Sequence, residues 1–361
     1  MSTDTAESLA DIEVFRRRVG TRLTEFVTDQ ASRLEELGPH LTSLLASAND
    51  AVRGGKRLRA AFCYWGWRSA DGDHDDDRIV TAAAAVEMLH ASALAHDDLM
   101  DDSDTRRGRP AAHRQFERLH RTGRWHGEAD RFGSGAAILL GDLLLSWSDE
   151  MLRTCGLDTE QVMRGLPYFD AMRTEVVAGQ YLDLVAQSSG QTSVPQAMRV
   201  VRYKAAKYTV ERPLHLGAAL AGAGEPLITA LTSYGLPLGE AFQLRDDVLG
   251  VFGDPGVTGK PAGDDLREGK RTVLMALAHE RADSEQHRVL ERQFGRRRLD
   301  DHGVEQLREV IRSSGALRAV EDLITELTSA ATTALDQAPI GDDEVRTALR
   351  ELAAVVTSRD W

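Results

Sequence analysis

Hydrophobic residues recur three and four positions apart along almost the whole chain, which is the spacing of one face of an α-helix. No run of residues alternates between polar and apolar in the manner of a strand. Turns that contain glycine separate the helical stretches, and no linker rich in Ser or Pro divides the chain. The sequence therefore predicts an all-α fold in one domain of residues 1–361. The predicted helices cover residues 7–33, 37–48, 55–70, 78–101, 111–121, 133–155, 159–188, 194–222, 225–253, 271–293, 302–327 and 342–358.

Three of the predicted helical stretches are apolar on nearly every side: residues 79–95, 133–145 and 236–252. Within the first of them, Glu87 and His90 are the strongly polar residues. A helix that is apolar all round is normally buried. We therefore expect these three helices to form the core, and we expect the charges within and just after them to lie beside that core.

Composition excludes several classes of protein. The chain has 361 residues, a net charge of −13 and 42% hydrophobic residues, which is too apolar for a disordered chain. Cys63 and Cys155 are its two cysteines, too few for a disulfide scaffold. The acidic balance argues against nucleic-acid binding. The longest apolar stretch, 136–145, is too short to span a membrane, and residues 1–15 lack the features of a secretory signal. A cytoplasmic location is expected.

Candidate chemistry begins with the acidic residues 97–104, which directly follow the first apolar helix. Asp97 and Asp101 are four positions apart, so on a helix both carboxylates face the same way and repel each other. Carboxylates held together beside a core need a cation, and Mg²⁺ prefers such oxygen ligands, often shared with substrate phosphates. By contrast, the acidic run 71–77 lies between helices without apolar neighbours and is interpreted as a solvated loop.

Basic residues follow the first acidic cluster and also form two further groups. Arginines that pair with a polyphosphate are expected in residues 106–109, directly after the carboxylates. The segment GGKRLR at 54–59 combines glycines with cations, but it is not a P-loop. The third group is made of lysines: Lys204, Lys207, Lys260 and Lys270.

Together these segments resemble the trans-isoprenyl diphosphate synthases, the polyprenyl synthetase family. The resemblance covers residues 50–280 in the family's order and spacing, followed by C-terminal helices over 281–361. Its five motifs are GGKRLR at 54–59, DDLMDDSDTRRGRP at 97–110, GQYLDL at 179–184, YKAAKYT at 203–209, and a second aspartate-rich motif made of FQLRDDVLGVFGD at 242–254 followed by GKPAGDDLREGKRT at 259–272. One such motif carries little weight, whereas five in order are specific.

The resemblance implies a bundle of long helices around a deep central cavity, a homodimer, and a Mg²⁺-dependent prenyltransferase. Its substrates are expected to be isopentenyl diphosphate and an allylic diphosphate, with three Mg²⁺ ions in the active site. The metal ligands carried over from the family are Asp97, Asp101 and Asp246. The residues carried over to the isopentenyl diphosphate site are Lys56, Arg59, His90 and Arg107. Those carried over to the allylic diphosphate site are Arg106, Lys204, Gln243, Lys260 and Lys270.

Two positions depart from the family pattern. Ala205 follows Lys204 where the family has a threonine, and Gly250 stands where a third aspartate is common. Lys207 matches no motif position and is interpreted as structural. For Gln180 and Asp183 two interpretations stay open, because each can line the cavity or simply pair with neighbours.

The expected product is geranylgeranyl diphosphate, with twenty carbons. In the family, bulky aromatics four and five positions before the first aspartate stop growth at fifteen carbons. Here these positions hold the small residues Ala93 and Ser92, while Met88 and Leu89 lie about one turn deeper and are expected to form the floor. This interpretation places all four residues on or near the face of the carboxylates. The alternative is a purely structural role, in which the small residues only allow close helix packing.

Three other functions share part of this sequence pattern. A farnesyl or longer-chain polyprenyl diphosphate synthase differs only in product length. A class I terpene cyclase shares the fold and the first metal motif, but it handles one diphosphate and has no use for GGKRLR or for the arginines after Asp104. A non-catalytic partner subunit would be expected to have lost an aspartate motif. His96 is interpreted as structural, since the departing pyrophosphate can accept the proton.

Overall fold

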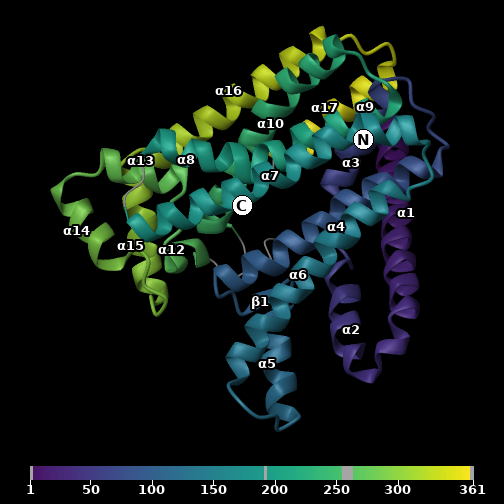
Figure 1. The fold of residues 1–361 in the computed structure, drawn as a ribbon. Helices are drawn as coiled ribbons and strands as arrows, with labels where there is room; N and C mark the ends of the chain where they lie inside the picture. The colour runs from purple at the N-terminus through teal and green to yellow at the C-terminus, as the bar shows by residue number, and fades with distance from the viewer. Residues whose placement is uncertain (1–2, 191–192, 254–262, 358–361) are drawn as a thin grey trace. The chain divides into compact units, whose positions relative to one another are not determined.

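The computed structural model describes residues 3–190, 193–253 and 263–357, and the side chains of these ranges from residue 13 onward. Most of these residues are helical, which confirms the all-α fold class (Figure 1). Two compact units are present, one made of Met1–Leu166 with Leu216–Gly222 and one made of Pro167–His215 with Ala223–Trp361. The single domain stays a prediction, and each unit is described by itself.

The first unit is built on the buried helix α4 (Asp77–Met100). Asp76 caps its first turn by accepting a hydrogen bond of 2.8 Å from the backbone N–H of Arg78. The alanines at 82–85 are fully buried, and small side chains allow α3 (Leu58–Ser69) and α6 (Ala129–Arg153) to pack closely. The other elements of this unit are α1 (Thr3–Arg33), η1 (Glu35–Leu37), η2 (Pro39–Leu41), α2 (Thr42–Ala51), α5 (Ala112–Thr122) and the start of α7 (Thr159–Ser189).

The expected burial of residues 79–95 is confirmed. By length and hydropathy α4 could cross a membrane, but 72% of its most apolar 18-residue window is buried inside the protein. That burial is typical of the core helix of a folded domain.

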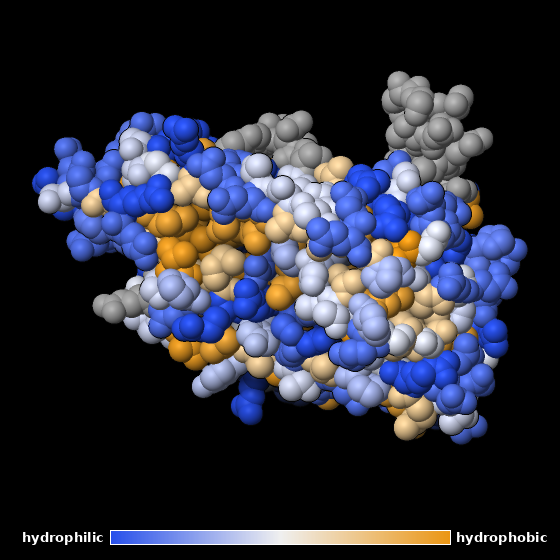
Figure 2. All heavy atoms as spheres, turned by 90° about the horizontal axis from the view of Figure 1, so that it is seen from above, coloured by the Kyte–Doolittle hydropathy of each residue, from blue (hydrophilic) through white to orange (hydrophobic). Residues whose placement is uncertain are grey.

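The expected burial of residues 133–145 is wrong for one side of α6. Leu140 and Leu144 face the core, whereas Ile138 is 46% exposed and Leu139 is 62% exposed. The apolar pattern on every side of a helix therefore did not mean burial within this one chain. Hydrophobic residues also gather in patches, bordered by hydrophilic ones, on the face shown in Figure 2. Large exposed apolar patches are typical of interaction surfaces.

A short hairpin follows α4, where no strand was predicted. Strands β1 (Thr105–Arg106) and β2 (Arg109–Pro110) pair antiparallel, with Arg106 opposite Arg109. The turn residues Arg107 and Gly108 have φ values of 52° and 73°. Two consecutive positive φ angles are the mark of a type I′ turn, which suits the twist of a hairpin. Two-residue strands are too short to show an alternating pattern in the sequence.

The second unit is built on α10 (Glu225–Phe252). Its apolar residues belong to a core formed with α13 (Val273–Arg281), α15 (Asp301–Ser313) and α16 (Ala316–Gln337), and α16 runs along α10 (Figure 1). This confirms the expected burial of 236–252. The unit also contains the end of α7, α8 (Val194–Val200), the start of α9 (Arg212–Ala221), α12 (Asp264–Glu268), α14 (Ser284–Gln293) and α17 (Asp343–Thr357).

Three predicted helices are divided in the structure. The stretch 194–222 contains a π-helical segment, η3 (Val201–Glu211), between α8 and α9. The stretch 271–293 breaks at Asp283, whose capping box starts α14. The stretch 302–327 breaks at Gly315, which has a φ of 76°. Apolar spacing alone did not reveal these breaks, because the hydrophobic residues continue through them.

Candidate active site

The last turn of α4 carries three carboxylates in the first unit. Asp98 and Asp101 are buried, with 4% and 9% exposure, and the side chain of Asp97 is 21% exposed. The backbone N–H of Asp101 still donates to the carbonyl of Asp97 at 2.9 Å, so the turn stays helical between them. Asp97 and Asp101 therefore lie on one helical turn, as predicted.

Arg106, from strand β1, contacts two of these carboxylates. Its guanidinium donates two hydrogen bonds to one carboxylate oxygen of Asp98 and lies 3.6 Å from a carboxylate oxygen of Asp97. Burial lowers the pKa of Arg106, but the hydrogen bond to Asp98 and the charges of Asp97 and Asp101 outweigh it, so its pKa is raised. Arg106 is thus a permanent cation directly beside the carboxylates, where a diphosphate would need one.

These residues fit a magnesium ion. Oxygen donors of carboxylates are what Mg²⁺ prefers, and one or two such donors per ion are usual when phosphates complete the shell. Asp97 and Asp101 share a turn and a side of the helix, so their carboxylates could hold such an ion together. Their role as metal ligands stays a prediction.

A cationic loop, defined here as residues 54–59, precedes α3 in the same unit and includes the first residues of that helix. Lys56 is exposed and Arg59 is half-buried. The turn residue Arg107 reaches this loop from the hairpin, since it donates a hydrogen bond of 2.7 Å to the carbonyl of Arg53. A Cβ atom at Gly55 would lie 2.9 Å from the Arg107 guanidinium, so only glycine allows this approach without a shift. The sequence-predicted cations Lys56, Arg59 and Arg107 are therefore gathered in one region.

His90 faces this cationic region from α4. Burial first, and then the charges of Arg59 and Arg107, hold the pKa of His90 well below its ordinary range. The imidazole is therefore neutral at pH 7. A neutral histidine can donate one hydrogen bond to a diphosphate oxygen without adding charge.

In the second unit, Lys204 of η3 contacts Asp183 of α7, with Nζ 2.6 Å from a carboxylate oxygen. A Cβ atom at Gly179 would overlap the backbone of Lys204, so this glycine lets η3 lie directly against α7. Asp183 is 9% exposed. Asp183 therefore pairs with a neighbour, and that neighbour is itself a predicted substrate-binding residue. Lys207 pairs with Glu175 at 3.0 Å and Glu211 at 3.3 Å, as expected of a structural lysine.

The second aspartate motif lies on α10. Asp246 is half-buried, whereas Asp247 is 7% exposed and accepts a hydrogen bond of 2.8 Å from Gln243. Burial, together with the charges of Asp265 and Asp246, raises the pKa of Asp247 to about 8, although the Gln243 hydrogen bond opposes this. Gln243 was predicted to bind the allylic diphosphate, and here its amide holds the neighbouring carboxyl group.

Asp265 of α12 is a residue that the sequence analysis missed. A Cβ atom at Gly250 would overlap the Asp265 carboxylate, so this carboxylate fills the space beside α10 that the common third aspartate would enter. The predicted substrate-binding residue Lys270 lies 3.5 Å from Asp265 and 3.1 Å from Glu268. The signal available in the sequence was the coincidence of a missing aspartate at 250 with an additional acidic pair at 264–265. Lys260 lies outside the described residues.

The predicted site residues thus fall into two groups. The first unit gathers the carboxylates of α4, the arginines of the hairpin and the cationic loop. The second unit gathers the lysines and the second aspartate motif. The residues of the first group are Lys56, Arg59, His90, Asp97, Asp101, Arg106 and Arg107, and those of the second are Lys204, Gln243, Asp246 and Lys270.

The predicted placement of the chain-length residues needs a correction. A residue turns an α-helix by about 100°, so Ala93 and Leu89 lie about 40° and 80° from Asp97, but Ser92 and Met88 lie about 140° and 180° away. The Ser92 hydroxyl accordingly donates a hydrogen bond of 2.7 Å to the carbonyl of Gly141 on α6. The expectation that Ser92 and Met88 share the carboxylate face is wrong, because five and nine residues are not whole turns.

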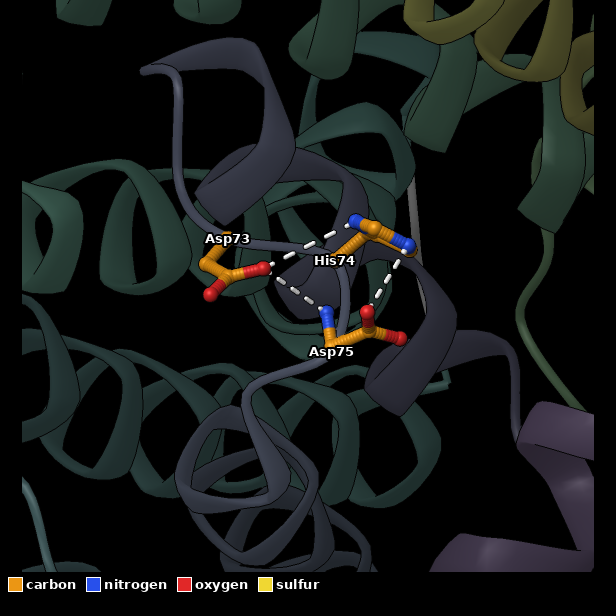
Figure 3. Close-up of side chains that lie close together, drawn as sticks. All are labelled: Asp73, His74 and Asp75. Atoms are coloured by element: carbon orange, nitrogen blue, oxygen red, sulfur yellow. Dashed lines mark hydrogen bonds and ion pairs between the residues drawn. The ribbon is translucent and has the colours of Figure 1, made fainter.

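Two other predicted groups have local partners. His96 lies 3.2 Å from the carbonyl of Ile138, and a Cβ atom at Gly141 would overlap its ring, so it packs against α6 as a structural residue. In the acidic loop, Asp73, His74 and Asp75 are exposed and lie close enough together to hold a metal ion (Figure 3). Their mutual contacts, at 3.6 Å and 3.2 Å from His74, agree with a solvated loop.

Comparison with known proteins identifies the family. The model of the polyprenyl synthetase family matches residues 42–311. The chain belongs to this family. It is a prenyltransferase with the all-α isoprenoid synthase fold. The chain is 43% identical to a geranylgeranyl pyrophosphate synthase from Corynebacterium glutamicum, whose crystal structure is complexed with isoprenyl diphosphate and magnesium; the match covers 96% of this chain and 99% of that one, with a TM-score of 0.92.

More distant relatives differ in their products. A geranylfarnesyl diphosphate synthase from Aeropyrum pernix is 31% identical over 317 residues, which is 87% of this chain and 93% of that protein. A geranylgeranyl diphosphate synthase from Saccharolobus solfataricus is 29% identical over 343 residues, which is 94% of this chain and 95% of that protein. The reaction type is common to these relatives, while product length varies among them. Magnesium dependence is general in the family.

Proposed function

We propose that this prenyltransferase condenses an allylic diphosphate with isopentenyl diphosphate, head to tail, and that its main product is geranylgeranyl diphosphate. The observation that carries the proposal is the composition of the first unit. The carboxylates at the end of α4, which we propose bind metal, and a separate cationic loop before α3 belong to the same compact body. An enzyme for a single diphosphate would need only one such group.

The roles of the residues follow from their charges. The carboxylates would hold Mg²⁺, for which we propose three ions, and the metal would supply positive charge for the pyrophosphate leaving group. Asp97, Asp101 and the half-buried Asp246 are the proposed ligands. Arg106 is fixed by Asp98 and stays positive, so it can neutralise charge that develops on the leaving group. Lys204 is held by Asp183 and is assigned to the same diphosphate, together with Gln243, Lys260 and Lys270.

The second substrate is assigned to the cationic loop. Lys56, Arg59 and Arg107 would bind the diphosphate of isopentenyl diphosphate, with His90 as a neutral hydrogen-bond donor. Holding its double bond within reach of the allylic carbon supplies much of the rate. The apolar residues of α4 exclude water, which would otherwise capture the cation.

We also propose a homodimer in the cytoplasm. The apolar side of α6 supports the dimer, because Phe132, Ile138 and Leu139 are exposed on the isolated chain at 36%, 46% and 62%. A second copy that covered this side would bury these residues. The mass in solution, measured by light scattering for the wild type and for Leu139→Asp, tests this part, since a monomeric wild type would contradict it.

Pyrophosphate release tests the reaction itself. Release should require Mg²⁺, an allylic diphosphate and isopentenyl diphosphate together. Lys56→Ala should mainly raise the KM for isopentenyl diphosphate, and Lys204→Ala should mainly raise the KM for the allylic substrate. Equal effects of each variant on both substrates would contradict the two separate pockets. Release from an allylic diphosphate alone would instead favour a cyclase.

Product length is tested by a bulky residue on the corrected face of α4. Ala93 is half-buried and lies on the side of Asp97, so Ala93→Phe should shift the product from twenty to fifteen carbons. Ser92→Phe serves as the contrast, because the larger ring must displace Gly141 of α6 and should lower thermal stability. An unchanged product from active Ala93→Phe enzyme would show that this face does not limit chain growth.

A further inference from the structure

The cationic loop contains one buried acid–base pair that the proposed reaction does not use. Arg57 is the second cation of GGKRLR, yet it is 6% exposed and turned inward. Its guanidinium donates to the carbonyl of Val52 and lies 3.5 Å from a carboxylate oxygen of Glu87, which is 4% exposed. A buried charge of this kind is retained only when it is paired.

Glu87 makes a second contact, to the start of α3. Its other carboxylate oxygen accepts a hydrogen bond of 3.1 Å from the backbone N–H of Ala60, in the first turn of that helix. Arg57 is the residue before α3, and it has a left-handed φ of 56° and makes no capping hydrogen bond with its side chain. The first turn therefore receives its acceptor from α4 instead of from its own N-terminal residue.

These contacts fix the backbone that carries the neighbouring cations. Lys56 and Arg59 lie on either side of Arg57, and Glu87 binds Arg57 and Ala60 at the same time. Non-glycine residues rarely adopt a left-handed backbone unless the surroundings hold them there. We propose that Glu87 is a positioning residue for isopentenyl diphosphate, which acts through Arg57 and the first turn of α3. This inference rests on the proposed function, which assigns that substrate to Lys56 and Arg59.

A purely electrostatic effect and a positioning role predict opposite changes in diphosphate binding when the charge of Glu87 is removed. Glu87 is an anion inside a cationic region, so its loss should by charge alone strengthen the binding of a diphosphate. If Glu87 holds the loop in place, its loss should weaken binding. The variant Glu87→Gln keeps an oxygen that can accept from Ala60 but removes the charge that pairs with Arg57.

The experiment measures KM for each substrate and kcat in the full-length enzyme with Mg²⁺. We expect Glu87→Gln to raise the KM for isopentenyl diphosphate about tenfold, and to change the KM of the allylic substrate and kcat less than about twofold. The matched control is Glu150→Gln, because Glu150 also joins two helices of this unit, through Gln30 and Arg33 at 2.8 Å. It should leave both KM values unchanged.

Lys56→Ala, measured in parallel, separates the two hypotheses. If Lys56→Ala does not raise the KM for isopentenyl diphosphate, the assignment of the loop itself is wrong. If it does, but Glu87→Gln lowers that KM or only lowers the melting temperature, the positioning role of Glu87 is overturned. Should Glu87→Gln fold poorly, Arg57→Gln removes the same pair from the other side, and an unchanged KM for isopentenyl diphosphate there would equally overturn the role.

Discussion

The two aspartate motifs look alike in the sequence, but their surroundings differ. In the first motif the second aspartate, Asp98, is paired with the cation Arg106. In the second motif the corresponding residue, Asp247, is held by the neutral amide of Gln243 and its pKa is raised to about 8. The comparison teaches that equal motif letters can lie in different surroundings, because the first buried carboxyl group has a cation as its partner, whereas the second has a neutral amide that does not offset the effect of burial.

The largest expected effect comes from removing the proposed metal ligands. Asp97→Ala, Asp101→Ala and Asp246→Ala should each lower kcat about 10²- to 10³-fold or more, because the leaving group loses its metal. Thermal unfolding should change little for Asp97→Ala, since repulsion between carboxylates is relieved as a contact to Arg106 is lost. A variant that instead unfolds, and regains turnover once it is stabilised, would make that aspartate structural.

Moving a carboxylate from position 265 to position 250 tests how the second motif differs from the first. Gly250→Asp should destabilise the protein by about 1–3 kcal/mol, because the new side chain would overlap Asp265. The double variant Gly250→Asp/Asp265→Gly moves the carboxylate back to the position where the family commonly has it. The double variant should recover much of the activity that Asp265→Gly alone loses, as measured by pyrophosphate release. No recovery would mean that Asp265 has a function that position 250 cannot supply.

The raised pKa of Asp247 predicts that stability depends on pH. Asp247 titrates near pH 8 in the folded protein but near pH 4 when unfolded, so between these values only the folded state keeps the proton. Stability therefore falls as the pH rises through this window, by at most about 1.4 kcal/mol per pH unit. Asp247→Asn removes this loss, so its advantage over the wild type should grow from pH 5 to pH 7.5.

Urea unfolding in the presence of a chelator measures this effect in the metal-free protein. Asp98→Asn is the contrasting variant, because it weakens the bonds to Arg106 and should lower stability rather than raise it. Parallel stability curves for the wild type and Asp247→Asn would show that Asp247 is ionised, and the proposed difference between the motifs would then disappear.

The smallest effect is expected in the acidic loop. Asp75 is exposed beside His74 and belongs to neither aspartate motif. Asp75→Ala should change kcat less than about twofold and stability less than about 0.5 kcal/mol. A loss of activity on this substitution, reversed by added Mg²⁺, would indicate a metal site outside the two motifs.

Much of this architecture could be predicted from the sequence. The buried helix α4 and the shared turn of Asp97 and Asp101 followed from apolar spacing and from a separation of four residues. The exposed side of α6 could not be predicted, since leucine and isoleucine have the same pattern in a core and in an interface. The contacts of Asp265 and Glu87 could not be predicted, because they join segments that are distant in sequence and leave no local spacing.

The π-helical segment η3 has a consequence for sequence comparison and for engineering. Such segments differ from an α-helix by wider hydrogen-bonded turns, so one residue more or fewer changes the register of everything on one side of them. Deleting a single residue from Val201–Glu211 would turn Lys204 by about 100° relative to one end of the segment, away from Asp183. When relatives are aligned, a gap placed in this segment changes which lysine is matched to the diphosphate-binding position. When the enzyme is engineered, the length of the segment therefore has to be preserved as well as its residues.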